Sequence, residues 1–140
     1  MSSPVGILIN SYLNAWNRHD VDALLKCFTD DCYYEDSAFA LQNRGKDQMC
    51  EFCRKSFRTF PNLRFDVGTV YSSRSGAGWN WTMSGNYSVA IEELRVPATG
   101  QAMVVKGASM TRFRKGLIEH NVDYYDSLKF LQQLGAFASQ

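Results

Sequence analysis

The chain has 140 residues, of which 45% are hydrophobic and 21% charged; this is an ordinary globular composition, and the length predicts a single domain over residues 1–140. With 15 Lys and Arg against 14 Asp and Glu, the formal charge of +1 supplies no field that would attract nucleic acid, so no nucleic-acid partner is expected. The N-terminus lacks the basic start of a signal peptide, and no stretch reaches the roughly 20 apolar residues of a membrane span, which predicts a soluble, cytoplasmic protein with no membrane partner.

Two helices are predicted at the start of the chain. Pro4 suits the first turn of a helix, and apolar residues recur at helical spacing after it, so residues 4–18 are predicted to form a long amphipathic helix. Asp20 is a good N-cap for a short second helix that extends through Phe28 and ends at residues 29–31.

A third helix is predicted to start after Gly45, capped near Asp47, and to stop at Pro61. It contains Cys50 and Cys53, which match the C-x-x-C spelling of zinc and redox sites. A zinc site needs four ligands, and residues at i and i+3 simply share one face of a helix. We therefore interpret the four cysteines of the chain as buried, reduced thiols and expect no metal.

Beyond residue 62 the hydrophobic period changes to two, which predicts strands. After a short strand at 32–36, the predicted long strands cover 63–71, 78–87, 101–113 and 117–125, and a short helix covers 127–134. Helices followed by an antiparallel meander are typical of the α+β class, in which helices pack on one face of the sheet. A strongly curved sheet of this kind would form a cone.

Short sequence phrases spread over nearly the whole chain carry a family resemblance. They are Tyr12–Asp20, Gly45–Asp47, Phe60–Leu63, Trp79–Thr82 with Gly85, Pro97–Gly100, Gly116–Ile118, Asp123–Asp126 and Gln133–Gly135. In this order they resemble the SnoaL-like polyketide cyclase and isomerase family of the nuclear-transport-factor-two-like superfamily. The resemblance implies an α+β barrel or cone, with a curved, mostly antiparallel sheet and three N-terminal helices around a pocket. It also implies a homodimer formed through the outer face of the sheet.

The last predicted strand supplies the main candidate for chemistry. Alternation places Glu119, Asn121, Asp123 and Tyr125 on one face and Ile118, His120, Val122 and Tyr124 on the other. The resemblance implies that Asp123 points into the cavity and handles a proton. A carboxyl among aromatic walls loses hydration, so its pKa is expected to rise toward the working pH. The alternative is a strand-end Asp123 that accepts hydrogen bonds from main-chain amides.

The same alternation places His120 outside the pocket, on the surface or at a dimer interface. Lys106 is likewise predicted to face solvent or a partner subunit. Asp126 is expected to lie at the rim, where it caps the terminal helix or holds the chain end.

Tyr34 and Asp36 lie two residues apart on the short strand and therefore on one face. They resemble the Tyr and Asn that position water in the limonene-epoxide hydrolases, with Asp36 in place of Asn. Two carboxyls in one apolar cavity tend to separate their pKa values into one acid and one base. Alternatively, Asp36 only begins the loop 37–39.

The resemblance has two departures. The epoxide hydrolases need an Arg and an Asp two apart on a middle strand, but residues 79–85 carry no charge, so epoxide hydrolysis by that route is not expected. The bacterial cyclases add a His on the strand that faces the catalytic Asp, and the nearest counterpart here is Ser109. Ser109 and Thr111 can still bond a substrate oxygen.

The function predicted by the resemblance is a cofactor-independent cyclase or isomerase. It would transfer protons on a hydrophobic, polyketide- or terpenoid-derived carbonyl compound of secondary metabolism. The expected site contains Asp123 and Asp36 as acid and base, Tyr34, Asn121 and Ser109 as hydrogen-bond partners, and Trp16, Trp81 and Tyr125 as walls. A non-catalytic ligand-binding or dimerisation domain, and a double-bond isomerase like the ketosteroid isomerases, remain alternatives.

Overall fold

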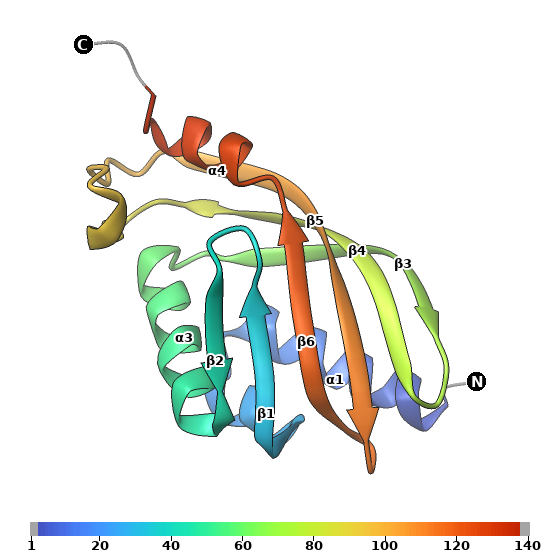
Figure 1. The fold of residues 1–140 in the computed structure, drawn as a ribbon. Helices are drawn as coiled ribbons and strands as arrows, with labels where there is room; N and C mark the ends of the chain where they lie inside the picture. Colours follow the sequence, from blue (N-terminus) through green and yellow to red (C-terminus); the bar gives the residue numbers. More distant parts are fainter. Residues whose placement is uncertain (1–2, 138–140) are drawn as a thin grey trace.

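The computed structural model describes residues 3–137 and folds them into a curved sheet with helices on one face and at one end (Figure 1). Its elements are α1 (Pro4–Arg18), α2 (Val21–Lys26), β1 (Phe28–Asp36), β2 (Leu41–Arg44), α3 (Gly45–Thr59), β3 (Arg64–Ser72), β4 (Gly76–Asn86), the 3-10 helix η1 (Glu92–Leu94), β5 (Ala102–Arg114), β6 (Leu117–Tyr125) and α4 (Ser127–Leu134). The α+β class expected from the sequence is confirmed. None of the helices within 3–137 has the length and apolar character needed to cross a membrane.

Side-chain caps explain where the first two helices begin. The Ser3 hydroxyl accepts a hydrogen bond from the Gly6 amide at 3.0 Å, and Pro4 occupies the first turn of α1. Asp20 caps α2 by accepting from the Ala23 amide at 3.0 Å, as its position in the sequence predicts. The prediction that this helix extends through Phe28 is wrong, because Phe28 begins β1 and pairs there with β6.

The six strands lie in the order β2-β1-β6-β5-β4-β3. Neighbouring strands are antiparallel except β1 and β6, which are parallel, so the expected mostly antiparallel sheet is confirmed. The sequence prediction missed β2, whose four residues are largely exposed and lack an alternating apolar pattern. The first strand also starts four residues earlier than predicted.

A bulge between β5 and β6 changes which side chains of β6 face inward. The pairing shifts between Arg112 and Phe113, opposite residues 118–120. Ile118 is therefore 1% exposed in the core, whereas Glu119 lies outside, 2.9 Å from Arg112. Simple alternation groups Glu119 with Asp123 and places Ile118 on the opposite face of the sheet, and both assignments are wrong. An extra residue in a strand reverses the faces to which the preceding side chains point.

Helices α1 and α3 cover the concave face of the sheet, and α4 lies across the far end of β5 (Figure 1). The Asn17 side chain ties α1 to the edge strand β3: its amide donates to the Phe65 carbonyl at 3.0 Å and its oxygen accepts from the Phe65 amide at 2.8 Å. Asp126 caps α4 by accepting from the Lys129 amide at 3.1 Å, as expected from the sequence.

Candidate active site

Two carboxyls meet inside the cone where β1 and β6 run parallel. Asp36 and Asp123 occupy paired positions on the two strands and are only 8% and 9% exposed. The loop after β1 is fixed beside β6, because the amide and hydroxyl of Ser37 donate to the main-chain carbonyl of Asp123 at 3.0 and 2.7 Å. The parallel register therefore places both acids at the same height in the cone.

Each carboxyl accepts a hydrogen bond from a tyrosine of the other strand. Tyr34 of β1 donates to Oδ2 of Asp123 on β6. Tyr125 of β6 donates to Oδ2 of Asp36 on β1 at 2.7 Å. The two Asp–Tyr pairs are thus reciprocal across the parallel strands, and each strand contributes one Tyr and one Asp spaced two residues apart.

Two further donors converge on the other oxygen of Asp123. The hydroxyl of Ser109 lies 2.6 Å from Oδ1, and the side-chain amide of Asn121 donates to it at 2.9 Å. All three hydrogen-bond partners of the Asp123 carboxyl are therefore side chains. This differs from a strand-end Asp bonded to main-chain amides, the structural alternative that the sequence left open.

A second tier of donors supports these partners. The Trp81 indole N–H donates to the Ser109 oxygen at 2.9 Å, and the Thr111 hydroxyl donates to Oδ1 of Asn121 at 2.6 Å. All of these side chains are buried, with Asn121 completely enclosed.

Asp36 is held less tightly than Asp123. Besides the bond from Tyr125, it accepts a long hydrogen bond from the main-chain amide of Phe39, at 3.4 Å. That contact is the loop-starting role proposed as an alternative for Asp36, and it is compatible with the second hydrogen bond. Asp36 therefore keeps more of its acceptor capacity open than Asp123 does.

Burial raises the pKa of both acids. For Asp36, loss of hydration raises the pKa from 3.8 to about 6; the hydrogen bond from Tyr125 opposes this rise and the charge of Asp123 adds to it. For Asp123, loss of hydration also raises the pKa, and the hydrogen bonds from Ser109, Tyr34 and Asn121 oppose the rise. Burial, followed by the charge of the neighbouring carboxylate, raises the pKa of Tyr34 and of Tyr125, so both phenols remain donors.

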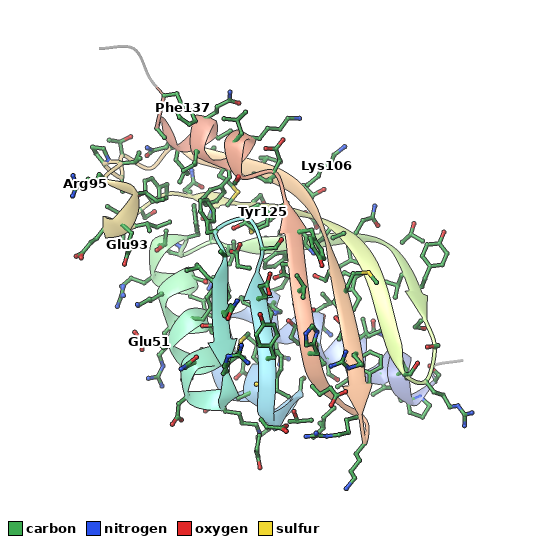
Figure 2. All side chains as sticks on the ribbon, in the orientation of Figure 1. Glu51, Glu93, Arg95, Lys106, Tyr125 and Phe137 are labelled. Carbon is green, nitrogen blue, oxygen red and sulfur yellow. The ribbon has the colours of Figure 1, made fainter. Side chains whose placement is uncertain are left out.

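Aromatic rings surround the two carboxyls. The ring centroid of Trp16 in α1 lies 6.4 Å from that of Tyr34 and 5.5 Å from that of Phe65. The ring centroids of Trp81 and Tyr125 are 6.1 Å apart. Phe39 and Phe130 close the end of the cone over Tyr125, at 6.2 and 5.8 Å. Figure 2 shows Tyr125 below α4 and the exposed Lys106 on the outside of the sheet.

All eight residues singled out from the sequence fall into this one cluster. Asp123, Asp36, Tyr34, Asn121, Ser109, Trp81 and Tyr125 are connected by hydrogen bonds or strand pairing, and Trp16 packs on Tyr34. Their chemical roles stay predictions. His120 stacks on Tyr33 at 4.9 Å, away from the carboxyls, as expected.

The sequence prediction missed two features of the site. It did not find the contacts of Phe39 and Phe130, because neither residue lies on a strand that lines the cone. It also treated Thr111 as a possible substrate contact, whereas in the structure the Thr111 hydroxyl is engaged by Asn121. Only the cross-strand pairing of Thr111 with Asn121, which alternation alone does not supply, identifies that bond.

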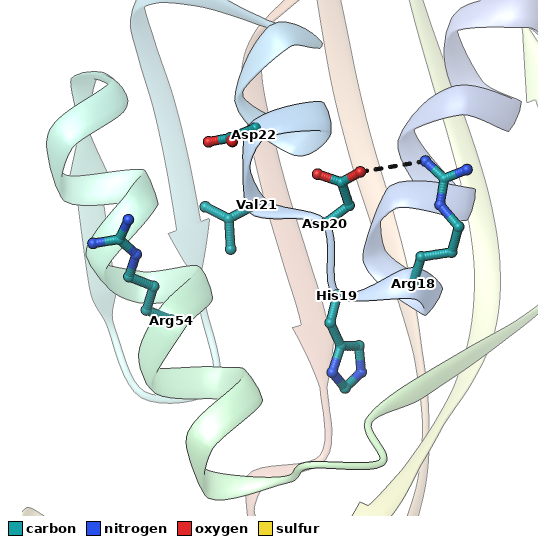
Figure 3. Close-up of a pocket in the computed structure, with 6 residues that line it drawn as sticks. All are labelled: Arg18, His19, Asp20, Val21, Asp22 and Arg54. Carbon is teal, nitrogen blue, oxygen red and sulfur yellow. Dashed lines mark ion pairs between the residues drawn. The ribbon is translucent and has the colours of Figure 1, made fainter.

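Two open surface hollows lie apart from the carboxyls. One, of about 570 Å³, is lined by Arg18, His19, Asp20, Val21, Asp22 and Arg54, with an Arg18–Asp20 ion pair of 3.7 Å (Figure 3). The other, of about 430 Å³, lies by the start of β1 and the turn between β5 and β6. Their polar, charged linings differ from the aromatic interior.

Three of the four cysteines are buried as predicted, but Cys50 is partly exposed, because it lies at the edge of the buried face of α3. Burial raises the pKa of the Cys53 thiol to about 12. Among residues 3–137, no group of three or more His, Cys, Asp or Glu side chains is arranged to hold a metal ion.

Comparisons with known proteins agree with this architecture. The model of the SnoaL-like polyketide cyclase family matches residues 7–134. A Xanthomonas campestris protein provisionally named a polyketide cyclase superimposes with a TM-score of 0.84 at 22% identity, over 94% of this chain and 96% of its own. TsrD from Streptomyces laurentii gives a TM-score of 0.82 at 25% identity, over 96% of both chains.

A Catenulispora acidiphila protein of ketosteroid isomerase-like fold, solved in complex with trimethylamine, gives a TM-score of 0.79 at 20% identity, over 95% of this chain and 97% of its own. The comparison with curated proteins gives no match. The likeness to these solved structures shows a shared fold.

Proposed function

The chain belongs to the SnoaL-like polyketide cyclase family, and on that premise we propose that it is a cofactor-independent cyclase or isomerase. The substrate we propose is a hydrophobic, polyketide- or terpenoid-derived carbonyl compound of secondary metabolism. One observation carries the proposal: two buried carboxyls at paired positions, each bonded to a phenol of the other strand. A buried carboxyl bonded to a phenol can both accept and donate a proton next to a substrate that has lost its water shell.

The proposed reaction begins with removal of a proton from the carbon next to a substrate carbonyl. An ionised carboxylate takes the proton, and a phenol or protonated carboxyl donates a hydrogen bond to the carbonyl oxygen as it gains negative charge. The resulting enolate attacks a second carbonyl carbon to close a ring, and the carboxylic acid returns its proton to the alkoxide oxygen that forms. Alternatively, the same acid returns the proton to another carbon of the enolate, which moves a double bond. The second outcome is the ketosteroid-isomerase-like alternative, and product analysis distinguishes the two.

We assign the principal role to Asp123 and the second to Asp36. Ionisation of either carboxyl makes ionisation of its neighbour less favourable, so one stays protonated while the other is charged. Tyr34, Asn121 and Ser109 are the proposed hydrogen-bond partners.

Trp16, Trp81 and Tyr125 are the proposed walls. An apolar lining with few polar groups suits a hydrophobic ligand. Because both carboxyls are almost fully enclosed, the aromatic side chains above them must shift for a substrate to enter.

The proposal is tested by proton exchange on a simple ketone. We expect the wild type to accelerate deuterium wash-in from D2O at the acidic CH2 of 2-tetralone, followed by proton NMR. Asp123→Asn should slow this exchange by roughly 10² to 10⁴-fold, the usual contribution of a positioned acid or base. Asp36→Asn should also slow it, and Asp66→Asn, which alters an exposed carboxyl on β3, should not.

Equal exchange in wild type and Asp123→Asn would contradict the assignment of Asp123. Loss in Asp36→Asn alone would transfer the principal role to Asp36.

The main alternative is a non-catalytic ligand-binding domain. The three hydrogen bonds donated to Asp123 favour it, because they stabilise a charged carboxylate that takes no part in a reaction. A binding domain has no need to keep Asp123 protonated near neutral pH. An ordinary Asp pKa for Asp123, measured by carboxyl carbon NMR, would favour this alternative over catalysis.

We also propose that the protein forms a homodimer through the outer face of its sheet. Val104 and Met110 of β5 and Tyr124 of β6 point outward there and are 56%, 57% and 50% exposed. Large apolar side chains on a sheet face that would otherwise meet water favour contact with another protein surface. A second copy of the chain is the partner that the family resemblance implies.

A further inference from the structure

Two chains of hydrogen bonds lead from β4 and β5 to the same oxygen of Asp123. We propose that Trp81, Gly107 and Thr111 are positioning residues that fix the direction of the donors on Asp123 Oδ1. Only the catalytic consequence of this inference rests on the proposed function. Its physical content, the control of one carboxyl by residues that do not touch it, can be measured without a substrate.

The first chain runs from Trp81 through Ser109. An indole N–H can only donate, so the Ser109 oxygen must act as acceptor toward Trp81, at 2.9 Å. The hydroxyl has a single hydrogen, which is left to point at Asp123 Oδ1, 2.6 Å away. Trp81 thus makes Ser109 a donor to Asp123 and disfavours the reverse arrangement, in which Ser109 accepts a proton from the carboxyl.

Gly107 makes room for this indole. A Cβ atom at position 107 would lie 2.3 Å from Cη2 of Trp81 and 2.6 Å from the Tyr124 carbonyl oxygen, both far inside normal contact distances. Gly107 is the cross-strand partner of Trp81, so the ring lies over the bare backbone of β5. The absence of a side chain there lets the indole reach along β5 to Ser109.

The second chain runs from Thr111 through Asn121. An Asn side chain has two orientations that exchange its oxygen and nitrogen, and only one directs an N–H toward Asp123. The Thr111 hydroxyl donates to Oδ1 of Asn121 at 2.6 Å, which leaves Nδ2 facing Asp123 at 2.9 Å. Thr111 and Asn121 are cross-strand partners, as are Ser109 and Asp123, so the four side chains form one compact block.

Both chains donate toward Asp123 and neither accepts from it. Oδ1 is therefore occupied by two hydrogen bonds, and a proton bound by this carboxyl resides on Oδ2, which faces Tyr34. The other titratable groups near Asp123 are Asp36 of β1, Tyr12 of α1 and Tyr125 of β6. Exchange of the catalytic proton is thus directed to the Tyr34 side of the carboxyl.

The test is a carbon NMR titration of the Asp123 carboxyl in protein labelled with ¹³C. Trp81→Phe removes the indole donor, and Thr111→Val removes the hydroxyl that orients Asn121. Each should move the midpoint of the Asp123 titration upward by about one pH unit, since a weaker hydrogen bond destabilises the charged form. Activity against 2-tetralone should show a matching alkaline shift of its pH profile.

Matched variants separate orientation from packing. Thr111→Ser keeps the hydroxyl and should restore the wild-type midpoint. Trp79→Phe replaces another buried tryptophan of β4 by a smaller ring. Trp79 is the cross-strand partner of Ser109, but the indole that bonds the Ser109 hydroxyl is that of Trp81. This variant should therefore leave the midpoint of the Asp123 titration unchanged.

Unchanged midpoints in folded Trp81→Phe and Thr111→Val would overturn the inference. A shift of equal size in Trp79→Phe would overturn it as well, because packing would then account for the effect. If the midpoints move as expected while Asp123→Asn retains full exchange activity, the positioning network stands and the proposed catalytic role of Asp123 fails.

Discussion

Asp36 illustrates how a buried acid makes stability depend on pH. Its pKa is about 6 in the folded protein and near 3.8 when it is solvated. Below about pH 3 the group is almost fully protonated in both states and has almost no effect on unfolding. Between pH 4 and 6 the unfolded chain loses this proton while the folded chain keeps it, so the free energy of unfolding falls as pH rises. Above about pH 7 both states are ionised, and the loss of stability is complete and constant.

Replacing Asp36 by Asn should therefore stabilise the protein at neutral pH. The amide removes the charge, and its oxygen can still accept the hydrogen bond from Tyr125. The two pKa values differ by about two units, which corresponds to about 3 kcal/mol at about 1.4 kcal/mol per unit. A neutral amide accepts a weaker hydrogen bond from Tyr125 than a carboxylate does, so we expect a smaller net gain of about 1–2 kcal/mol at pH 7.5. Urea unfolding of wild type and variant should show this gain at pH 7.5 and almost none at pH 3. A difference that does not change with pH would contradict the argument.

One side chain of helix α4 forms both hydrogen bonds that a neighbouring strand would form with β5. The Gln133 oxygen accepts from the Val104 amide at 2.6 Å, and the Gln133 amide donates to the Val104 carbonyl at 2.8 Å. Phe130, on the same helix, closes the cone over Tyr125. The position of α4 therefore decides how well the end of the cone is sealed.

Gln133→Ala should loosen α4 without unfolding the sheet. Two lost hydrogen bonds at a partly exposed site correspond to a destabilisation of about 1–2 kcal/mol. Hydrogen exchange followed by mass spectrometry should become faster in residues 127–134 and stay unchanged in β4. Gln132→Ala is the control, because Gln132 is exposed on the same helix. Ala is a better helix former than Gln, so equal acceleration in the control would mean that loss of any long side chain loosens α4, rather than loss of this attachment.

At the scale of single elements, the features that depend on local sequence were predicted better than those that depend on how strands pair. The caps Asp20 and Asp126 and the shared face of Tyr34 and Asp36 follow from local geometry, and the structure contains them. The predicted cap near Asp47 is wrong, because α3 begins at Gly45 and Asp47 lies inside its first turn. The bulge at Glu119 of β6 does not follow, since it arises from how β5 and β6 are aligned. A period of two assigns faces correctly only as long as no residue is inserted.

At the scale of the whole molecule, the site depends on the register of four strands. That Asp36 lies beside Asp123 requires β1 to run parallel to β6, although the two strands are separated by about 80 residues of chain. That Trp81 reaches Ser109 requires the β4–β5 register and a glycine at position 107. The sequence therefore identifies the participants through their types and family resemblance, but their hydrogen bonds are a property of the assembled sheet.

The outer face of the same sheet yields the prediction for the assembled protein. Met110 and Tyr124 are large, exposed and on adjacent strands, so a charge at either position should oppose contact between two copies. We expect wild type to sediment as a dimer and Met110→Glu or Tyr124→Glu to shift it toward monomer by tenfold or more in dissociation constant, which corresponds to about 1.4 kcal/mol. Tyr71→Glu on β3, where the side chain is 76% exposed, controls for added charge alone. A monomeric wild type at micromolar concentration would contradict the dimer, whereas equal dissociation in all three variants would place the interface elsewhere than on β5 and β6.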